Sequence, residues 1–307
     1  MKNINVLIIG GTGFIGRTLS SAFSANGYGV TVLSRELSKV PSMSDDIPVI
    51  RGDILKPGQW QELISEYDVL INLAGASIFR CWTPNAKREM LESRIVTTRN
   101  IVDALRIRSG KVKHFFSVSG VGYYGFHKDE VLDENDRRGN DFLASVAAQW
   151  EDEAQRASEC GVRLVICRLG HVLGLGGGVL PKLVSLAKLH LASRWGSGAQ
   201  WISWVHEADV SGALLFLLDN EVMSGPVNVT APEPVQNREI MELLSQLTRK
   251  RVLVPPVPGF ILRIMTGEFA TVFVSGQKVI PRKLLADGYS FKFSTIQNAL
   301  HNLLLSS

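Results

Sequence analysis

Cysteine is scarce in this 307-residue chain, and its pattern marks neither a disulfide framework nor a metal site. The three cysteines, Cys81, Cys160 and Cys167, are odd in number and lack the paired spacing of zinc ligands. They fit free thiols in a reducing cytoplasm, which is the location that we expect.

Long apolar runs are also missing. No stretch reaches the roughly 20 residues that span a bilayer as a helix, so we expect no membrane partner. Because Met1 leads within a few residues into the first expected strand, we expect no signal peptide. A block of one charge is absent too, because 33 Lys and Arg are spread among 29 Asp and Glu, for a net charge of +4. We therefore expect no nucleic-acid partner.

What the chain does have is a glycine-rich turn near its start. An apolar stretch at 6–9 precedes it, a helix-like stretch at 17–25 follows it, and its G-x-G-x-x-G pattern falls on Gly11, Gly13 and Gly16. In this order, glycines let backbone N–H groups approach the pyrophosphate of a dinucleotide, although a plain tight turn would also fit. The cofactor contacts expected here are Gly10, Thr12, Gly13, Phe14, Ile15 and Gly16.

The end of the second expected strand, at 30–33, bears on the choice of cofactor. An acidic side chain there would bind the ribose hydroxyls of NAD(H), but the chain has Ser34 and Arg35. An arginine matches the oxygens of a 2′-phosphate and offsets its charge, which favours NADP(H). The alternative is a solvated Arg35, with the neighbouring Glu36 on the ribose.

Strand-like and helix-like segments alternate along the first 230 residues. Strands are expected at 6–9, 30–33, 48–51, 69–73, 113–118, 163–169 and 227–229, and helices at 17–25, 60–66, 84–108, 142–160 and 208–219. Thr83 is the expected N-cap of the helix at 84–108, and Gly161 is expected to end the helix at 142–160. This alternation predicts an α/β fold, a Rossmann-like doubly wound parallel sheet whose ligands lie beyond the carboxyl ends of the strands.

The regularity breaks after Gly174. Loops containing Trp195, Trp201 and Trp204 are interpreted as substrate-side segments, with the tryptophans as core anchors or as part of a cleft. A helix at 237–249 has a buried face formed by Ile240, Leu243, Leu244 and Leu247. We expect an NADP-binding domain at 1–235, which includes these loops, and a small, mostly helical C-terminal lobe at 236–307.

Several motifs together carry a family resemblance: GGTGFIG at 10–16, GDI at 52–54, NLAGA at 72–76, SVSGVGYYG at 117–125 and RLGHVLG at 168–174. The chain resembles the extended short-chain dehydrogenase/reductases of the NAD-dependent epimerase/dehydratase superfamily. GSGAQWISWVH at 196–206 and SGQKVIPRKLLADGYSF from 275 resemble, more narrowly, an atypical epimerase-like subfamily with a small C-terminal domain of unknown role. The resemblance implies NADP(H) on a Rossmann fold and leaves the substrate open.

The same resemblance implies where a site would lie. Asp53 is expected near the adenine, or else is a turn residue. Leu73, Ala74 and Gly75 are expected beside the nicotinamide-side ribose, or else they form a simple turn at the end of a strand. Ser119 matches the family serine that binds the substrate oxygen.

The proton-handling pair of the family is missing. The positions of its Tyr and Lys fall on Leu143 and Ala147, and Arg94 stands where the family often has a helix Asn. The residues that could replace the pair are Tyr123, Tyr124, His206 and Arg94, each of which also has a purely structural interpretation. We take Ser119 and Tyr123 as the candidate catalytic residues.

Three functions remain open. One is an NADP(H)-dependent oxidoreductase or epimerase that acts on an unidentified small molecule. Another is a catalytically silent NADP(H)-binding regulator. A nucleotide-sugar epimerase would need side chains that bind a diphosphate, and Lys182, Lys188 and Arg194 are the only Lys or Arg residues between 174 and 194. We expect a monomer or a homodimer.

Overall fold

A seven-stranded parallel sheet organises the first part of the molecule. The computed structural model describes residues 3–35, 46–108 and 110–305. The sheet has the order β11-β7-β5-β4-β1-β2-β3, and all its neighbouring strands are parallel. Its strands are β1 (Asn5–Ile9), β2 (Gly29–Ser34), β3 (Val49–Arg51), β4 (Val69–Asn72), β5 (His114–Gly120), β7 (Arg163–Leu169) and β11 (Gly225–Val229). The predicted Rossmann-like fold is confirmed.

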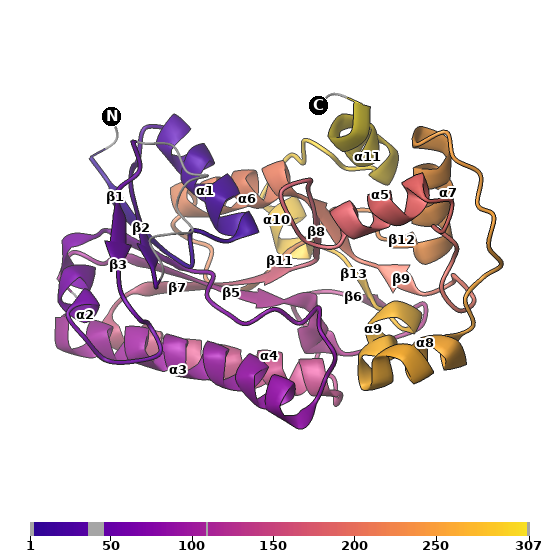
Figure 1. The fold of residues 1–307 in the computed structure, drawn as a ribbon. Coiled ribbons are helices and arrows are strands. Elements are labelled where there is room, and N and C mark those ends of the chain that lie inside the picture. Colours follow the sequence, from indigo (N-terminus) through magenta and orange to yellow (C-terminus); the bar gives the residue numbers. More distant parts are fainter. Residues whose placement is uncertain (1–2, 36–45, 109, 306–307) are drawn as a thin grey trace.

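Helices cover both faces of this sheet (Figure 1). One face carries α1 (Phe14–Ala25) and α6 (Glu207–Asp219), and the other carries α2 (Trp60–Leu63), α3 (Pro84–Arg108) and α4 (Phe142–Gln155). A 3-10 turn extends α2 to Glu66 and another extends α4 to Cys160. The predicted end signals are confirmed: Ala86 N–H donates to Thr83 Oγ1 over 3.2 Å, and Gly161 is left-handed with φ +74°.

Successive side chains of a strand point to opposite faces of the sheet, and in β1 both sets are apolar from Val6 to Ile9. Val6 and Ile8 pack with the α1 and α6 side, whereas Leu7 and Ile9 pack with the α3 and α4 side. Every one of these four side chains is fully or almost fully buried. A strand with apolar residues on both faces belongs in a sheet that helices cover on both sides.

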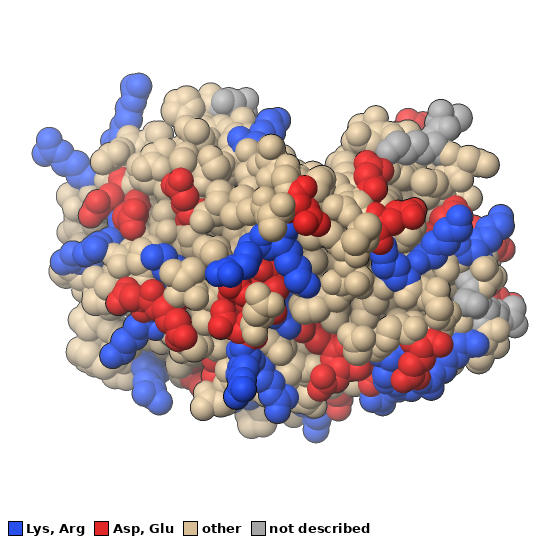
Figure 2. Space-filling view, turned by 180° about the vertical axis from the view of Figure 1, so that it is seen from behind, with Lys and Arg blue, Asp and Glu red and all other residues tan. Residues whose placement is uncertain are grey.

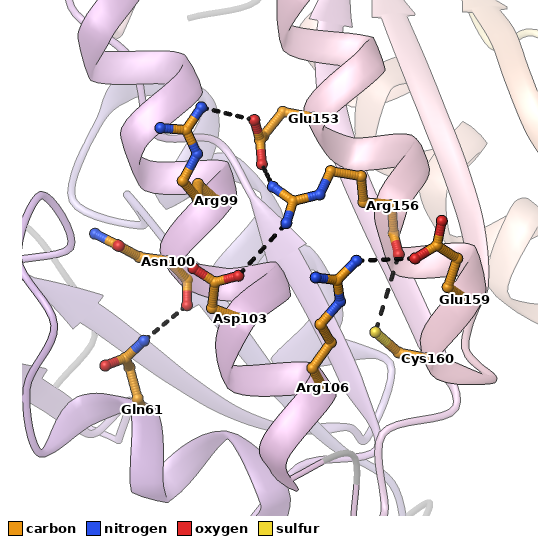
Figure 3. A network of polar contacts seen from close by, with 9 residues as sticks. All are labelled: Gln61, Arg99, Asn100, Asp103, Arg106, Glu153, Arg156, Glu159 and Cys160. Atoms are coloured by element: carbon orange, nitrogen blue, oxygen red, sulfur yellow. Dashed lines mark hydrogen bonds and ion pairs between the residues drawn. The ribbon is translucent and has the colours of Figure 1, made fainter.

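Ion pairs tie α4 to the neighbouring helix α3 on their outer side (Figure 3). Glu153 pairs with both Arg99 and Arg156, and Arg156 also reaches Asp103. Arg106 pairs with the exposed Glu159 over 2.8 Å. These ion pairs thus join the two long helices that cover this face of the sheet.

Most of the remaining elements form the lobe at the right of Figure 1. The helices of this lobe are α5 (Leu180–Lys188), α7 (Asn237–Leu247), α8 (Gly259–Thr266), α9 (Thr271–Val274) and α11 (Ile296–Leu305), with a 3-10 turn at Gly267–Ala270. Helix α10 (Arg282–Ala286) lies nearer the middle, beside α6 and β11, and a 3-10 turn at Val121–Tyr124 directly follows β5. Short strands pair as β8 (His171–Leu173) with β10 (Trp204–His206), β9 (Trp201–Ile202) with β12 (Val235–Gln236), and β6 (Val131–Leu132) with β13 (Lys278–Val279). The helix expected at 237–249 ends two residues earlier, at Leu247.

This lobe shares its core with the substrate-side loops. Trp204 is fully buried in a cluster that also contains Leu183 of α5, Leu244 of α7 and Leu300 of α11. The C-terminal segment also returns to the sheet, where the Lys283 ammonium donates to the Pro226 carbonyl over 2.8 Å. The lobe is therefore anchored on the Rossmann part through side chains and backbone alike.

Surface charge is mixed. On the face seen in Figure 2, Lys and Arg side chains are interspersed with Asp and Glu. Within the described residues, no helix combines the length and the apolar character needed to cross a membrane. Cys81 is exposed, Cys160 half-buried and Cys167 buried, and all three are free thiols.

Candidate functional site

The glycine turn joins the end of β1 to the start of α1, and its backbone is tightly packed. Gly10 has φ +81°, a conformation that favours glycine. A Cβ on Gly16 would lie 2.4 Å from Gly11 Cα, so a side chain cannot be accommodated there. A Cβ on Gly13 would instead meet only the Gly10 carbonyl, at 3.4 Å.

The N-terminus of α1 has the character of an anion site. Gly13 is its N-cap, no side chain caps the helix, and no acidic residue lies in the first turn. The first N–H groups of a helix have no partner within it, and they sit at the positive end of its dipole. The residues present thus fit a pyrophosphate, which needs these donors and would be repelled by a carboxylate.

Three of the predicted cofactor residues meet at the tip of β2. Thr12 Oγ1 lies 3.4 Å from Ser34 Oγ, and Arg35 follows with an exposed side chain. Arg17 Nη1 donates to the Thr12 carbonyl over 2.8 Å and so fixes the turn from the helix side. Glu36, the alternative ribose ligand, lies outside the described residues.

The ends of β3 and β4 carry the other predicted cofactor residues. Asp53 is exposed, and its Oδ1 accepts a hydrogen bond from Leu55 N over 3.2 Å, as in an Asx turn. Beyond β4, Leu73 N–H donates to the Ile9 carbonyl and Ala74 N–H to Asn72 Oδ1. The backbone up to Gly75 is therefore held beside the glycine turn.

A cleft of about 330 Å³ opens beyond the carboxyl ends of β4, β5 and β7. Phe14 and Ile15 of the glycine turn form one wall, and Leu143, Ala147 and Trp150 of α4 form another. Most of the lining is apolar, and its polar or charged side chains include Arg94, Ser119, Asp141, His171, Ser275 and Gln277. Trp195 and Trp201 line a separate, smaller cavity of about 40 Å³, and Trp204 lines neither.

Ser119, near the end of β5, is the residue through which a buried polar network reaches the cleft. Its hydroxyl donates to Glu151 Oε1 over 2.7 Å. Arg168 of β7 binds the same carboxylate with two N–H groups, at 2.9 Å and 2.6 Å. Burial alone would lower the pKa of Arg168, but hydrogen bonding and the charge of Glu151 raise it, so the guanidinium stays protonated.

The candidate tyrosines belong to this network rather than to the cleft wall. The ring of Tyr123 covers the Arg168 guanidinium, with 3.4 Å between Cζ and the ring centroid, and Tyr123 does not line the cleft. The Tyr124 hydroxyl accepts from Arg168 Nη1 and donates to Asn228 Oδ1. Burial raises the pKa of Tyr124 to about 12, which makes it a poor base at neutral pH.

His206 also lies apart from the cleft. Its ring stacks on Phe293, and its Nδ1 accepts from Ala208 N over 3.0 Å as the N-cap of α6. Burial lowers the pKa of His206 to about 4, so the ring is neutral at pH 7. Of the four candidate replacements for proton handling, Arg94 alone lines the cleft.

The sequence interpretation missed the residues that hold the site in shape. It assigned no role to Arg168 or to Glu151. Thr98 was missed as well: its hydroxyl accepts from Trp150 Nε1 at 2.9 Å and from Asn72 Nδ2 at 3.1 Å. Glutamate and arginine within two apolar elements were the available signal, because buried charges require partners.

Two family models match the chain. The NAD dependent epimerase/dehydratase model matches residues 6–230, and a domain of unknown function, DUF1731, matches residues 257–303. The chain belongs to the NAD-dependent epimerase/dehydratase family. The predicted resemblance, including the C-terminal domain, is thereby confirmed.

Relatives within this epimerase family match over nearly the full length of the chain. The Arabidopsis thaliana protein named epimerase family protein SDR39U1 homolog, chloroplastic, is 35% identical over 99% of this chain and 87% of its own length. Epimerase family protein YfhF of Bacillus subtilis is 32% identical over 98% of each chain. The name of the plant relative assigns that protein to the chloroplast, and a cytoplasmic location for the present chain stays a prediction.

Solved structures agree with this placement. The crystal structure of human epimerase family protein SDR39U1 (isoform 2) with NADPH matches with a TM-score of 0.85 and 30% identity, over 98% of this chain and 99% of that one. A Thermus thermophilus UDP-glucose 4-epimerase in complex with NAD matches with a TM-score of 0.77 over 99% of this chain and 98% of that one. At 20% identity, the second match shows the fold alone.

Proposed function

We propose that this member of the epimerase family is an NADP(H)-dependent oxidoreductase or epimerase that acts on a small molecule. The observation that carries the proposal is a single cleft bounded both by the glycine turn, through Phe14 and Ile15, and by Ser119 at the end of β5. A bound nicotinamide dinucleotide supplies hydride transfer at such a place. The human relative solved with NADPH supports the choice of cofactor.

The phosphate-binding residues would divide their work along the turn. The first N–H groups of α1 would hold the pyrophosphate, while Thr12, Ser34 and Arg35 would hold the adenosine 2′-phosphate. Arg35 suits this role because its side chain is exposed at the tip of β2 and carries a planar pair of donors. Asp53 would border the adenine, and the backbone of Leu73, Ala74 and Gly75 would border the nicotinamide ribose.

Ser119 and Tyr123 are the proposed catalytic residues. Because the Ser119 proton is donated to Glu151, its oxygen presents lone pairs to the cleft and suits the hydroxyl of an alcohol substrate. Tyr123 would supply the phenol for proton transfer, and its ring would have to leave the Arg168 guanidinium to do so.

A catalytically silent NADP(H)-binding protein is the second candidate. Leu143 and Ala147 line the cleft, and in the proposed alignment they replace the family's Tyr and Lys. Loss of a positioned acid or base typically removes about 10²–10⁴-fold in rate. The bound cofactor would then serve as a signal, with the C-terminal lobe as the part that meets a partner.

Calorimetry on a glycine variant tests cofactor binding. In Gly13→Ala the new Cβ meets only the Gly10 carbonyl, so the fold should persist while the phosphate loop is obstructed. We expect NADPH affinity to fall at least about tenfold, which is 1.4 kcal/mol. The matched control is Gly259→Ala, whose Cβ would approach only the Val274 side chain and should leave affinity unchanged. Equal NADPH binding by both variants would contradict the proposed site.

Stopped-flow NADPH oxidation separates the two candidate functions. An oxidoreductase should oxidise bound NADPH in the presence of at least one carbonyl compound from a chemically varied panel. Tight NADPH binding with no oxidation across the panel would support the silent regulator.

We also propose a functional division at residues 235 and 236, between an NADP-binding part and a C-terminal lobe that completes the substrate side. The support is that Val272, Ser275 and Gln277 of the lobe help to line the cleft. Monomer and homodimer both remain predictions.

A further inference from the structure

Arg94 occupies an unusual place in the cleft. It lies on α3, and its guanidinium sits against the backbone just beyond β4. A Cβ built on Gly75 would lie 3.0 Å from Arg94 Cζ, so the two residues are in direct contact. The other side of the guanidinium faces Trp150, whose ring centroid is 5.1 Å from Cζ. Gly75 thus leaves the space into which Arg94 fits.

The charge of Arg94 has no carboxylate partner within the described chain. Its Nη1 donates to the Ala76 and Met90 carbonyls, over 3.0 Å and 2.9 Å. Its Nε and Nη2 make no hydrogen bond to any residue that the structure describes. Arg168, the other arginine beside the cleft, has Glu151 as its counter-ion. Arg94 is therefore a fixed, partly buried cation with its donor edge left for a ligand.

Burial lowers the pKa of Arg94 but does not remove its charge at neutral pH. Desolvation lowers the pKa of Arg94 to about 10, which still leaves it protonated at pH 7. An unpaired charge in such surroundings is costly to the free protein. An anion that enters the cleft removes that cost, and this raises its affinity relative to a neutral analogue.

The other side chains of the cleft define which anion fits. Asp141 is the acidic side chain of the lining, and its Oδ1 is engaged as the N-cap of α4, where it accepts from Ala144 N. Burial lowers the pKa of His171, so its ring adds no positive charge at pH 7. One cation suits a monoanion better than a phosphate dianion. The Nε and Nη2 donors of an arginine match the two oxygens of a carboxylate.

We infer that Arg94 binds the carboxylate of the substrate, which is a small carboxylic acid with an apolar body. The inference rests on the proposed use of this cleft as the substrate site. The apolar body would pack against Ile15, Leu143 and Trp150. The cleft of about 330 Å³ lies at the lower limit for ligand pockets and would also receive the nicotinamide, which favours a small compound.

Calorimetric titration of the full chain saturated with NADPH tests the inference, with benzoate, benzamide and phenyl phosphate as probes. A hydrogen-bonded charge contributes about 1.5–3 kcal/mol, so benzoate should bind at least about tenfold more tightly than benzamide. Phenyl phosphate should bind more weakly than benzoate. Arg94→Gln should bring benzoate to within about twofold of benzamide, and Arg94→Lys, which keeps the charge, should retain part of the preference.

Arg88→Gln is the matched control on the same helix. Arg88 is exposed, and the structure gives its side chain one hydrogen bond, to Asn85. This variant should retain the full preference for benzoate. Circular dichroism and thermal unfolding establish whether each variant is folded. If Arg94→Gln is not folded, the comparison of benzoate with benzamide is made on Arg94→Lys.

Several outcomes would overturn the inference: equal binding of benzoate and benzamide by the wild type, a preference that survives Arg94→Gln, or no detectable benzoate binding. If phenyl phosphate bound more tightly than benzoate, and did so through Arg94, the ligand group would be a phosphate and the inferred carboxylate would be wrong. NADPH binding is measured first. Its failure would remove the proposed function alone, and the same titrations on cofactor-free protein would still decide the role of Arg94.

Discussion

Glu151→Gln would break the buried network behind Ser119 while keeping the shape of the side chain. Glu151 is 8% exposed and Arg168 is 3% exposed, and two N–H groups of the arginine bind the carboxylate at 2.9 Å and 2.6 Å. Removing one partner of a buried ion pair typically costs 3–5 kcal/mol, because the other charge stays buried. Arg168 keeps the Tyr124 hydroxyl and the Tyr123 ring, so we expect about 3 kcal/mol.

Urea unfolding at neutral pH, followed by circular dichroism, measures this loss in the free energy of unfolding. The control is Glu159→Gln, since Glu159 pairs with Arg106 on the surface (Figure 3), with side chains 68% and 43% exposed. Breaking an exposed pair should cost at most about 1 kcal/mol. Replacing the buried pair together, as Glu151→Leu with Arg168→Met, should cost less than Glu151→Gln alone. A cost below about 1 kcal/mol for Glu151→Gln would refute the view that Arg168 depends on this carboxylate.

Three further predictions concern other parts of the structure. Below pH 6.5 the unfolded chain protonates His206, whereas the folded protein, with a His206 pKa of about 4, stays neutral at this ring. The free energy of unfolding should therefore decrease as the pH is lowered from 7, by about 2 kcal/mol at pH 5. His206→Asn, which preserves an N-cap, should flatten that part of the profile in urea titrations, and an unchanged slope would assign it to other groups. Asp141→Ala removes the cap of α4 and should lower the free energy of unfolding by about 1 kcal/mol. An unchanged free energy of unfolding would show that this cap does not stabilise the helix. Leu143→Tyr with Ala147→Lys places a phenol and an ammonium on the cleft side of α4, and should accelerate NADPH oxidation with a reducible carbonyl compound by at least about tenfold; no gain would count against the proposed alignment.

The sheet and its covering helices could be predicted because their signals are local. Strand β7 spans 163–169 and helix α3 spans 84–108, as expected from apolar runs, Pro84 and the Thr83 cap. Other boundaries shifted by a few residues. Helix α1 begins at Phe14 rather than Arg17, because the turn itself enters the helix, and β5 extends to Gly120 and so includes Ser119.

The pairings between distant segments could not be predicted in the same way. Two-residue strands such as β6 and β13 leave no periodic pattern, although they join positions 131 and 278. The partner of Glu151 lies on another element, and nothing local in the sequence selects Arg168. Arg94 also had a purely structural interpretation, and only the three-dimensional arrangement places it at the cleft without a carboxylate partner among the described residues.

The central claim is that the glycine turn and the tip of β2 bind the phosphates of NADP(H). Isothermal titration of the wild type and of Arg35→Asp with NADPH and NADH tests it most directly. We predict that the wild type binds NADPH at least about tenfold more tightly than NADH, and that Arg35→Asp reverses this order. Absence of heat with either cofactor, or a wild-type preference for NADH, would contradict the claim.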